Sequence, residues 1–281
     1  MLHFTQNESL KSARVVKMMT WQRKIVDTDA GQIETIDIGT EQCRAILLVT
    51  HGLGSAHSVE EIADGLSARF PGRRIVAYSR PGRGASPHPK GAAALNILSH
   101  EAHILLPALM RALALTEVDI VAHSDGVAVA MIFACAHPWM VGRMVAISPR
   151  VHAGDVACGN DDMIEIEKLC AEHADVKTAI RCQAAQREAM SADPGMVLDH
   201  VGALTAPLLL IQGLRDEYGA QIQMEALSDR IRGPMKWVML RHDGHFPQHD
   251  NPDVVIDMIC GHLDEVTSET ADKARHRRGV T

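Results

Sequence analysis

Short, mostly apolar runs alternate along this chain with longer segments whose apolar residues recur at helical spacing. Runs of this length indicate buried strands, and the longer segments indicate helices that pack on them. The expected strands are residues 45–50, 74–78, 118–123, 144–148, 206–212 and 235–240. The expected helices are residues 59–70, 92–115, 125–137, 220–231 and 252–265. Strands that alternate with helices predict an α/β fold, in which a mostly parallel central sheet carries helices on both faces.

Other segments depart from this alternation and set the expected domain boundaries. Residues 21–38 are expected to enter the sheet as antiparallel strands. Residues 151–204 indicate two or three helices, inserted before the penultimate strand. We therefore expect a core built from residues 21–150 and 205–266. Residues 1–20 and 267–281 are expected to be flexible polar ends.

A serine lies at the junction between one expected strand and the helix that follows it. Ser124 is flanked two residues away by Ala122 and Gly126. Small residues at these positions allow a very sharp strand-to-helix turn, which lifts a nucleophilic serine clear of the sheet. The pattern alone is weak, because it recurs by chance and most such serines cap helices. The motifs upstream and downstream must therefore decide between the two interpretations.

A glycine-containing loop follows the strand expected at residues 45–50. Gly52 and Gly54 allow close backbone approach on either side of Leu53. We expect the amide of Leu53 to join the amide of Asp125 as an oxyanion hole, the pair of donors that holds the negative oxygen of a tetrahedral intermediate. The alternative is that the glycines only form a turn before the next helix.

Two further strands end in residues suited to an acid and a base. Asp216 follows the strand expected at residues 206–212, and His245 follows the one at 235–240. A carboxylate at such a position can orient a histidine and stabilise its imidazolium form. Asp216 is the expected acid, with Glu217 as its nearest competitor, and His245 is the expected general base. The order serine, acid, histidine is the order found in hydrolases with a serine at a strand-to-helix turn.

These segments in this order resemble the α/β-hydrolase superfamily, over about residues 21–266. The loop at residues 80–86 is similar to the superfamily's Gly-x-Gly-x-Ser loop. Residues 123–126, together with segments 147–152 and 212–219, look like a bacterial subgroup that carries Gly-His-Ser-Asp-Gly. The sequence departs from the usual pattern twice, with alanine in place of glycine at position 122 and serine in place of aspartate at position 79.

The resemblance also implies the place of the pocket. In this architecture the insertion at residues 151–204 lies over the active site as a helical lid. The insertion has ten Asp or Glu and four Lys or Arg, which argues mildly against polyanionic substrates. Expected substrate contacts are Gly52, Arg150 and His152, which lie beside the region where the pocket should form.

Other histidines allow a metal site as an alternative interpretation. His242, His245 and His249 have the spacing of helical metal ligands, but Gly244 and Pro247 would break any helix there. No metal or other cofactor is therefore expected. The remaining histidines near the site, His51 and His123, are expected to have structural roles, the second by packing or bonding beneath the serine turn.

Composition narrows the classes of function. A net charge of −7 provides no general basic field for nucleic acid or an anionic membrane. The six cysteines show no C-x-x-C spacing, which favours reduced thiols over a disulfide framework. No stretch reaches about 18 apolar residues, and the chain begins with a segment of mixed polarity rather than a signal sequence. We expect a cytoplasmic protein that acts on a small molecule, and the composition leaves a homo-oligomer open.

The motifs together predict a serine hydrolase. Ser124 would attack the carbonyl of a small ester, lactone, thioester or amide, with His245 as base and Asp216 as orienting acid, and form an acyl-enzyme. The same scaffold leaves other functions open, because fold does not fix reaction. These are a C–C bond hydrolase of diketone-like substrates, a cofactor-free ring-opening dioxygenase that tolerates loss of the serine, and a ligand-binding protein without turnover. Dehalogenase and epoxide hydrolase chemistry are disfavoured, because each needs a carboxylate at position 124.

Overall fold

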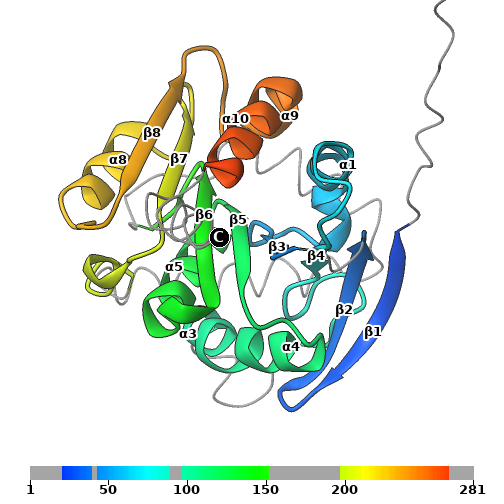
Figure 1. Ribbon diagram of the computed structural model, residues 1–281. Coiled ribbons are helices and arrows are strands. Elements are labelled where there is room, and N and C mark those ends of the chain that lie inside the picture. The colour runs from blue at the N-terminus through cyan, green and yellow to red at the C-terminus, as the bar shows by residue number, and fades with distance from the viewer. Residues whose placement is uncertain (1–20, 40–42, 89–96, 152–196, 266–281) are drawn as a thin grey trace, which may run out of the picture.

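The computed structural model describes residues 21–39, 43–88, 97–151 and 197–265 (Figure 1). Within these residues one sheet of eight strands runs through the molecule in the order β1-β2-β4-β3-β5-β6-β7-β8. The strands are β1 (Gln22–Thr28), β2 (Gly31–Ile38), β3 (Ala45–Val49), β4 (Ile75–Tyr78), β5 (Val118–His123), β6 (Val141–Ile147), β7 (Leu208–Gly213) and β8 (Met235–Leu240).

The strands β1 and β2 pair antiparallel with each other, and β2 pairs antiparallel with β4. All other neighbours, from β4 to β8, pair in parallel. The expected α/β class, the mostly parallel sheet and the antiparallel entry are therefore confirmed. Parallel strands end at a common edge of the sheet, so the loops after β3, β5, β6, β7 and β8 lie at the same edge.

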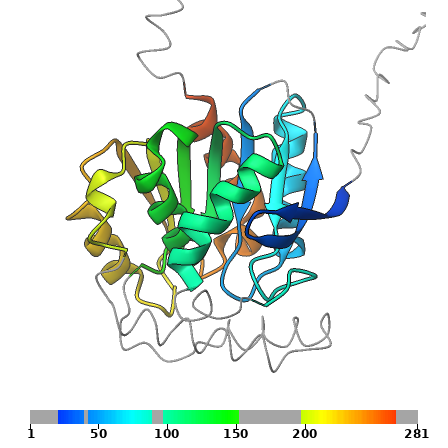
Figure 2. The same cartoon turned by 90° about the horizontal axis from the view of Figure 1, so that it is seen from below.

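Helices cover both faces of the sheet (Figures 1 and 2). The main helices are α1 (Glu60–Arg69), α3 (Ile97–His100), a π-helical turn η2 (Glu101–Leu105), α4 (Leu106–Ala112), α5 (Gly126–Ala136), α8 (Ala220–Ser228), α9 (Pro247–Asp250) and α10 (Pro252–Asp264). Short 3-10 turns are η1 (Ala56–Val59), η3 (Pro138–Met140) and η4 (Val201–Ala203).

Two hydrophobic clusters pack against the two faces of the sheet. Leu47 of β3 lies in the cluster that contains α4, α5 and the π-helical turn, whereas its neighbours Ile46 and Leu48 lie in the cluster that contains α1 and α10. Alternate residues of a strand point to opposite faces, so a strand covered on both sides is apolar throughout. This explains why the buried strands β3 and β4 are apolar throughout.

Some element bounds differ from those expected, for local reasons. The helix expected at residues 92–115 ends at Ala112 in its described part, because Ala114 has a positive φ of 56° that an α-helix cannot contain. The strand expected at residues 144–148 begins earlier, at Val141, and ends before Ser148, whose φ is 42°. The helix expected at 220–231 ends at Ser228.

Most of the expected lid, residues 152–196, lies outside the described residues, as do the two terminal extensions expected at residues 1–20 and 267–281. The last residues of the insertion are described, and Val197, Leu198 and Val201 are buried in the core beside α5. The segment that returns from the insertion to β7 is therefore part of the core packing.

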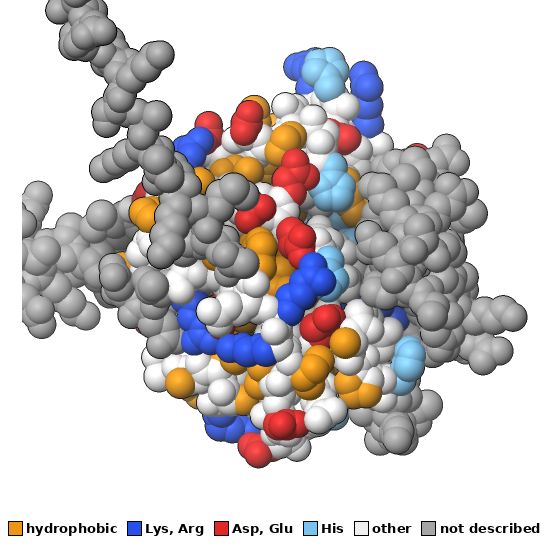
Figure 3. Space-filling view, turned by 90° about the vertical axis from the view of Figure 1, so that its right-hand side faces the viewer, with side chains coloured by type: hydrophobic (Ala, Val, Ile, Leu, Met, Phe, Trp, Pro, Cys, Tyr) orange, Lys and Arg blue, Asp and Glu red, His pale blue; other side chains and the backbone are white. Residues whose placement is uncertain are grey.

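Across the described helices, none combines the length and apolar character that a membrane span needs. The face of the molecule that carries α1 and β1 shows acidic and basic side chains interspersed rather than gathered by sign (Figure 3). One such pair, Arg23 of β1 and Glu60 of α1, is 3.2 Å apart. This face therefore presents no continuous basic surface, in agreement with the net charge.

Candidate active site

Ser124 occupies a tight turn between β5 and α5. Its φ is 57°, a left-handed value that is uncommon for residues other than glycine. The turn is held by backbone hydrogen bonds, from the Ser124 amide to the Ile147 carbonyl at 2.9 Å and from the Arg150 amide to the Ser124 carbonyl at 3.1 Å. Strained backbone of this kind persists only where its surroundings hold it, and it is concentrated at functional sites.

Glycine is required two residues after the serine because the turn lies directly against β3. A Cβ atom on Gly126 would lie 2.2 Å from the carbonyl oxygen of Thr50 and 2.9 Å from that of Val49. At position 122, by contrast, alanine replaces the usual glycine, and its side chain is buried within β5. The close packing therefore explains one small residue of the motif and tolerates a methyl group at the other.

Three side chains from separate parts of the chain are joined by hydrogen bonds at this turn. His245 Nε2 lies 2.8 Å from Ser124 Oγ, and His245 Nδ1 lies 2.9 Å from Asp216 Oδ2. The side chains come from loops after β5, β7 and β8, and each residue is at most 8% exposed. With Nδ1–H donating to the carboxylate, Nε2 is the ring atom that accepts the serine proton.

The carboxylate of Asp216 has further donors. Gln212 Nε2 donates to Oδ2 at 2.7 Å, and the amide of Tyr218 donates to Oδ1 at 2.9 Å. Donors of this kind stabilise the ionised carboxylate and fix its orientation. Glu217, the competing acid, is exposed and is not the carboxylate bonded to His245. Sequence reasoning missed the contribution of Gln212, although a polar residue at the end of an apolar strand is a detectable signal.

His123 supports the loop of the histidine, as its position beneath the serine turn suggests. Its Nε2 donates to the backbone carbonyl of His245 at 2.9 Å, and its ring packs 4.8 Å from that of Phe246. Burial lowers the pKa of His123 well below its usual range, and the nearby rings of His245 and His51 lower that pKa further. The ring is therefore neutral and acts as a fixed donor under His245.

The loops that carry Leu53 and Asp125 lie side by side, because they follow the paired strands β3 and β5. The carboxylate of Asp125 packs on Gly52 so closely that a Cβ atom there would lie 2.3 Å from Oδ2. The loop is also fixed internally, since Thr50 Oγ1 donates to the Gly54 carbonyl at 2.9 Å. The backbone of both proposed oxyanion donors is thus held by close packing.

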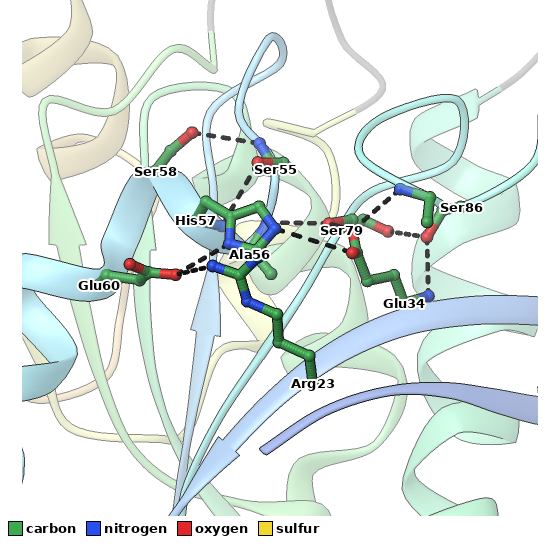
Figure 4. A network of polar contacts seen from close by, with 10 residues as sticks. Arg23, Glu34, Ser55, Ala56, His57, Ser58, Glu60, Ser79 and Ser86 are labelled. Atoms are coloured by element: carbon green, nitrogen blue, oxygen red, sulfur yellow. Dashed lines mark hydrogen bonds and ion pairs between the residues drawn. The ribbon is translucent and has the colours of Figure 1, made fainter. Parts of the chain in front are cut away.

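The loop after β4 is anchored by a carboxylate from another strand (Figure 4). Ser79 Oγ donates to Glu34 Oε2 at 2.6 Å and accepts from the Ala56 amide at 2.9 Å. The same Glu34 oxygen accepts from the Ala85 amide at 2.9 Å. Glu34 of β2 therefore supplies the negative charge that an aspartate at position 79 would supply. Ser79 hydrogen-bonds both to this carboxylate and to the Ala56 amide, and so links Glu34 to the segment after the Gly52 loop. Sequence reasoning missed Glu34.

The expected substrate contacts have different outcomes. Arg150 lies beside the site, with its guanidinium 4.0 Å from the centre of the Tyr218 ring, which in turn packs 4.6 Å from the ring of His245. Gly52 lies in the loop beside Asp125. His152 lies outside the described residues. Contact of any of these residues with substrate stays a prediction.

The histidines of the metal alternative do not converge. His245 is buried, whereas His242 and His249 are exposed. His242 Nδ1 lies 3.4 Å from an Arg215 nitrogen, and the His249 ring stacks on Phe246. Among the described residues, no group of three or more His, Cys, Asp or Glu side chains is arranged to hold a metal ion.

Comparison with known proteins agrees with the topology. Residues 45–169 match the family model described as alpha/beta hydrolase fold. A search of curated protein sequences gave no significant match. Many solved structures share the fold of this chain at low sequence identity.

One similar structure is a putative lipase from Acinetobacter baumannii AYE, with a TM-score of 0.71 and 16% identity, covering 86% of this chain and 91% of the other. Another is 2-hydroxy-6-oxo-6-phenylhexa-2,4-dienoate hydrolase from Rhodococcus sp. strain RHA1, with a TM-score of 0.71 and 16% identity, covering 88% and 100%. A bacterial membrane phospholipase A has a TM-score of 0.69 and 18% identity, covering 87% and 86%. These likenesses show that the chain has the α/β-hydrolase fold.

Proposed function

We propose that this chain, which has the α/β-hydrolase fold, is a serine hydrolase that acts on a small ester, lactone, thioester or amide. Ser124 is the proposed nucleophile, His245 the general base and Asp216 the orienting acid. The observation that carries the proposal is the hydrogen-bonded series from Ser124 Oγ to His245 Nε2 at 2.8 Å and from His245 Nδ1 to Asp216 Oδ2 at 2.9 Å. Both distances are within the range expected for a nucleophile and its base.

In the first half of the reaction His245 Nε2 takes the proton of Ser124 while Oγ attacks the carbonyl carbon. The amides of Leu53 and Asp125 hold the negative oxygen of the tetrahedral intermediate. The intermediate then breaks to the acyl-enzyme, and His245 gives its proton to the leaving group. In the second half His245 activates a water molecule, which hydrolyses the acyl-enzyme and restores the serine. No step requires a cofactor.

Burial of the three side chains supports this use. Buried charge interactions are stronger than exposed ones, so the carboxylate of Asp216 can stabilise the imidazolium form of His245 effectively. Asp216 keeps its charge compensated by Gln212 and the Tyr218 amide throughout. The arrangement is thus prepared for the charge that forms during the reaction and needs little reorganisation.

A second candidate is hydrolysis of a carbon–carbon bond. It is favoured by two structural neighbours, the Rhodococcus hydrolase and a meta-cleavage product hydrolase from Pseudomonas fluorescens IP01. The same serine, acid and base would serve such a reaction on a diketone-like substrate. Lipase and phospholipase neighbours share the fold to a similar degree, so assays of both substrate classes distinguish the two reactions.

The proposal is tested with p-nitrophenyl acetate and a fluorophosphonate probe. Ser124→Ala should lower turnover by at least about a thousandfold without loss of folding, because the nucleophile is removed. The wild-type protein should be labelled covalently on Ser124 and release nitrophenolate in a burst. Absorbance of 2-hydroxy-6-oxo-6-phenylhexa-2,4-dienoate, followed in parallel, tests the carbon–carbon reaction.

Ser148→Ala is the matched control. Ser148 is also buried, has a positive φ of 42° and follows the neighbouring strand β6. It should keep the covalent labelling that Ser124→Ala loses. A folded wild-type protein that neither labels nor turns over any of these substrates would contradict the proposal and favour a binding protein or a reaction independent of the serine.

A further inference from the structure

Arg80, in the loop after β4, has its guanidinium buried beneath the active-site turn. The residue is 3% exposed. Its Nε and Nη2 atoms donate to the carboxylate of Glu101 at 2.9–3.1 Å. Its Nη1 atom donates to Asp125 Oδ1 at 3.0 Å and lies 3.4 Å from the carbonyl oxygen of Thr50. One planar side chain thus contacts the end of β3, the residue after Ser124 and the helix of Glu101.

The two residues on the far side of Arg80 belong to the loops with the proposed oxyanion donors. Asp125 carries one of the donor amides, and its carboxylate packs on Gly52, the residue before Leu53. Thr50 begins the loop of Leu53 and accepts from Arg80 at its carbonyl. Any displacement of the Asp125 side chain would therefore move both loops relative to each other.

A second buried arginine from the same loop binds Gly52, on which the carboxylate of Asp125 packs. Arg83 Nε donates to the Gly52 carbonyl at 2.7 Å. The amide of Arg83 donates to the carbonyl of Arg80 at 2.8 Å, so a tight turn fixes the two side chains relative to each other. The loop after β4 therefore reaches both neighbouring loops at once.

Charge is balanced within this group. Burial lowers the pKa of Arg80, but the charges of Glu101 and Asp125 outweigh burial and raise that pKa above its ordinary value. Glu101 is fully buried and also accepts a hydrogen bond from the Tyr78 hydroxyl at 2.7 Å. Arg80 thus offsets the negative charge of the Asp125 carboxylate beside the position where a negative oxygen would form.

We propose that Arg80 is a positioning residue for the oxyanion hole, which it sets by holding the Asp125 side chain between Glu101 and the Gly52 loop. Arg80 itself does not touch the substrate. It acts through Asp125, whose amide it orients and whose negative charge it offsets. This inference rests on the proposed function, since it assigns a role within the same reaction.

The test compares an ester with the corresponding thionoester, p-nitrophenyl acetate and p-nitrophenyl thionoacetate. Amide donors bind a developing oxygen anion better than a sulfur anion, so an intact oxyanion hole favours the ester. Arg80→Gln should lower kcat for the ester by about 10- to 100-fold, somewhat less than removal of a whole donor, with KM changed by less than about threefold. The ester-to-thionoester ratio of kcat/KM should fall by about tenfold.

This ratio separates positioning from a merely structural role, because a smaller fraction of folded enzyme lowers both rates equally. Arg73→Gln is the matched control. Arg73 is also buried and pairs with a buried aspartate, Asp119, at the opposite ends of the strands. It should lower the melting temperature and leave the ratio at the wild-type value.

Arg80→Lys and Glu101→Gln keep the proposal testable if Arg80→Gln does not fold. A lysine retains the charge but cannot bridge Glu101 and Asp125 in the same plane, so it should give an intermediate ratio. Wild-type ratios in every folded Arg80 or Glu101 variant would overturn the proposal. If instead wild-type protein does not hydrolyse the ester at all, or Ser124→Ala retains full activity, it is the proposed function that fails.

Discussion

His123 and His262 make the same kind of hydrogen bond at opposite ends of the strands. Each is buried and donates from Nε2 to a backbone carbonyl, His123 to His245 at 2.9 Å and His262 to Pro207 at 3.1 Å. Burial lowers the pKa of both, so both rings are neutral. Of the two, only His123 contacts the loop of the proposed general base, so two chemically matched positions have different expected effects.

His123→Phe should lower kcat for p-nitrophenyl acetate by about tenfold, because the carbonyl of His245 loses its donor and the imidazole of His245 is less well fixed. Small misplacements of a group in an active site reduce the rate strongly. His262→Phe should lower the free energy of unfolding by about 1–3 kcal/mol, since it also leaves a buried carbonyl without its donor, and leave kcat unchanged. Steady-state kinetics and thermal unfolding of both variants measure these effects. Equal kcat in the two variants would show that His123 has no role beyond packing.

Packing between elements makes a similar distinction for two glycines. Gly126 at the start of α5 has no room for a Cβ atom, which would lie 2.2 Å from the Thr50 carbonyl oxygen, whereas Gly261 in α10 has nothing within 4 Å. Gly126→Ala should destabilise the protein by about 1–3 kcal/mol and lower activity, because β3 and α5 must separate at the serine turn. Gly261→Ala should stabilise it by roughly 0.5–1 kcal/mol, as alanine favours a helix.

Denaturant unfolding and ester kinetics of the two variants check this prediction. A Gly126→Ala variant with wild-type stability and turnover would mean that β3 yields to α5 without cost. The comparison matters for the motif itself, because it separates a glycine needed for close approach from one that is present in an open helix surface.

The elements that sequence predicted well are those whose pattern is local. The strands at residues 118–123 and 235–240 have the expected bounds, because each is a short and mostly apolar run between polar segments. β5 is buried throughout, whereas β8, at the edge of the sheet, is only partly covered. Asp216 and His245 were expected from their positions after strands, and the structure joins His245 by hydrogen bonds to both Asp216 and Ser124. Their catalytic roles stay a prediction.

The contacts that sequence did not predict depend on the order of strands in the sheet. Glu34 reaches Ser79 only because β2 pairs with β4, and Arg80 reaches Asp125 only because β4 lies next to β3 and β3 next to β5. No spacing along the chain encodes such neighbours. Their residue types gave a weak signal at most, since a charged residue in a loop is usually solvated.

On the scale of the whole molecule, burial of several titratable groups ties stability to pH. Burial lowers the pKa of His123 and His262 in the folded protein. The unfolded chain binds protons at these positions near pH 6.5, whereas the folded protein does not. The stability that these two neutral histidines contribute is therefore complete above about pH 6.5 and is lost as the pH falls below it.

The opposite sign applies on the alkaline side. Burial raises the pKa of Cys135 and of Cys260 to about 11, and burial together with the charge of Glu101 raises that of Tyr78 well above its usual value. The unfolded chain would release these protons at lower pH than the folded protein. Their contribution is complete below about pH 8.5, the ordinary value for a thiol, and is lost as the pH rises above it.

The melting temperature should therefore be highest between about pH 6.5 and 8.5 and fall on both sides. Thermal unfolding in buffers from pH 5 to pH 10, at constant ionic strength, measures the profile. In the His123→Phe and His262→Phe variants, the melting temperature should decline less steeply on the acid side. In Cys135→Val and Cys260→Val, it should decline less steeply on the alkaline side. Each variant lacks one group that changes its proton binding on unfolding. A melting temperature that is constant from pH 7 to pH 5 would mean that the two buried histidines acquire protons without opening the fold. The assignment of neutral rings to His123, beneath the active site, and to His262, in α10, would then be wrong.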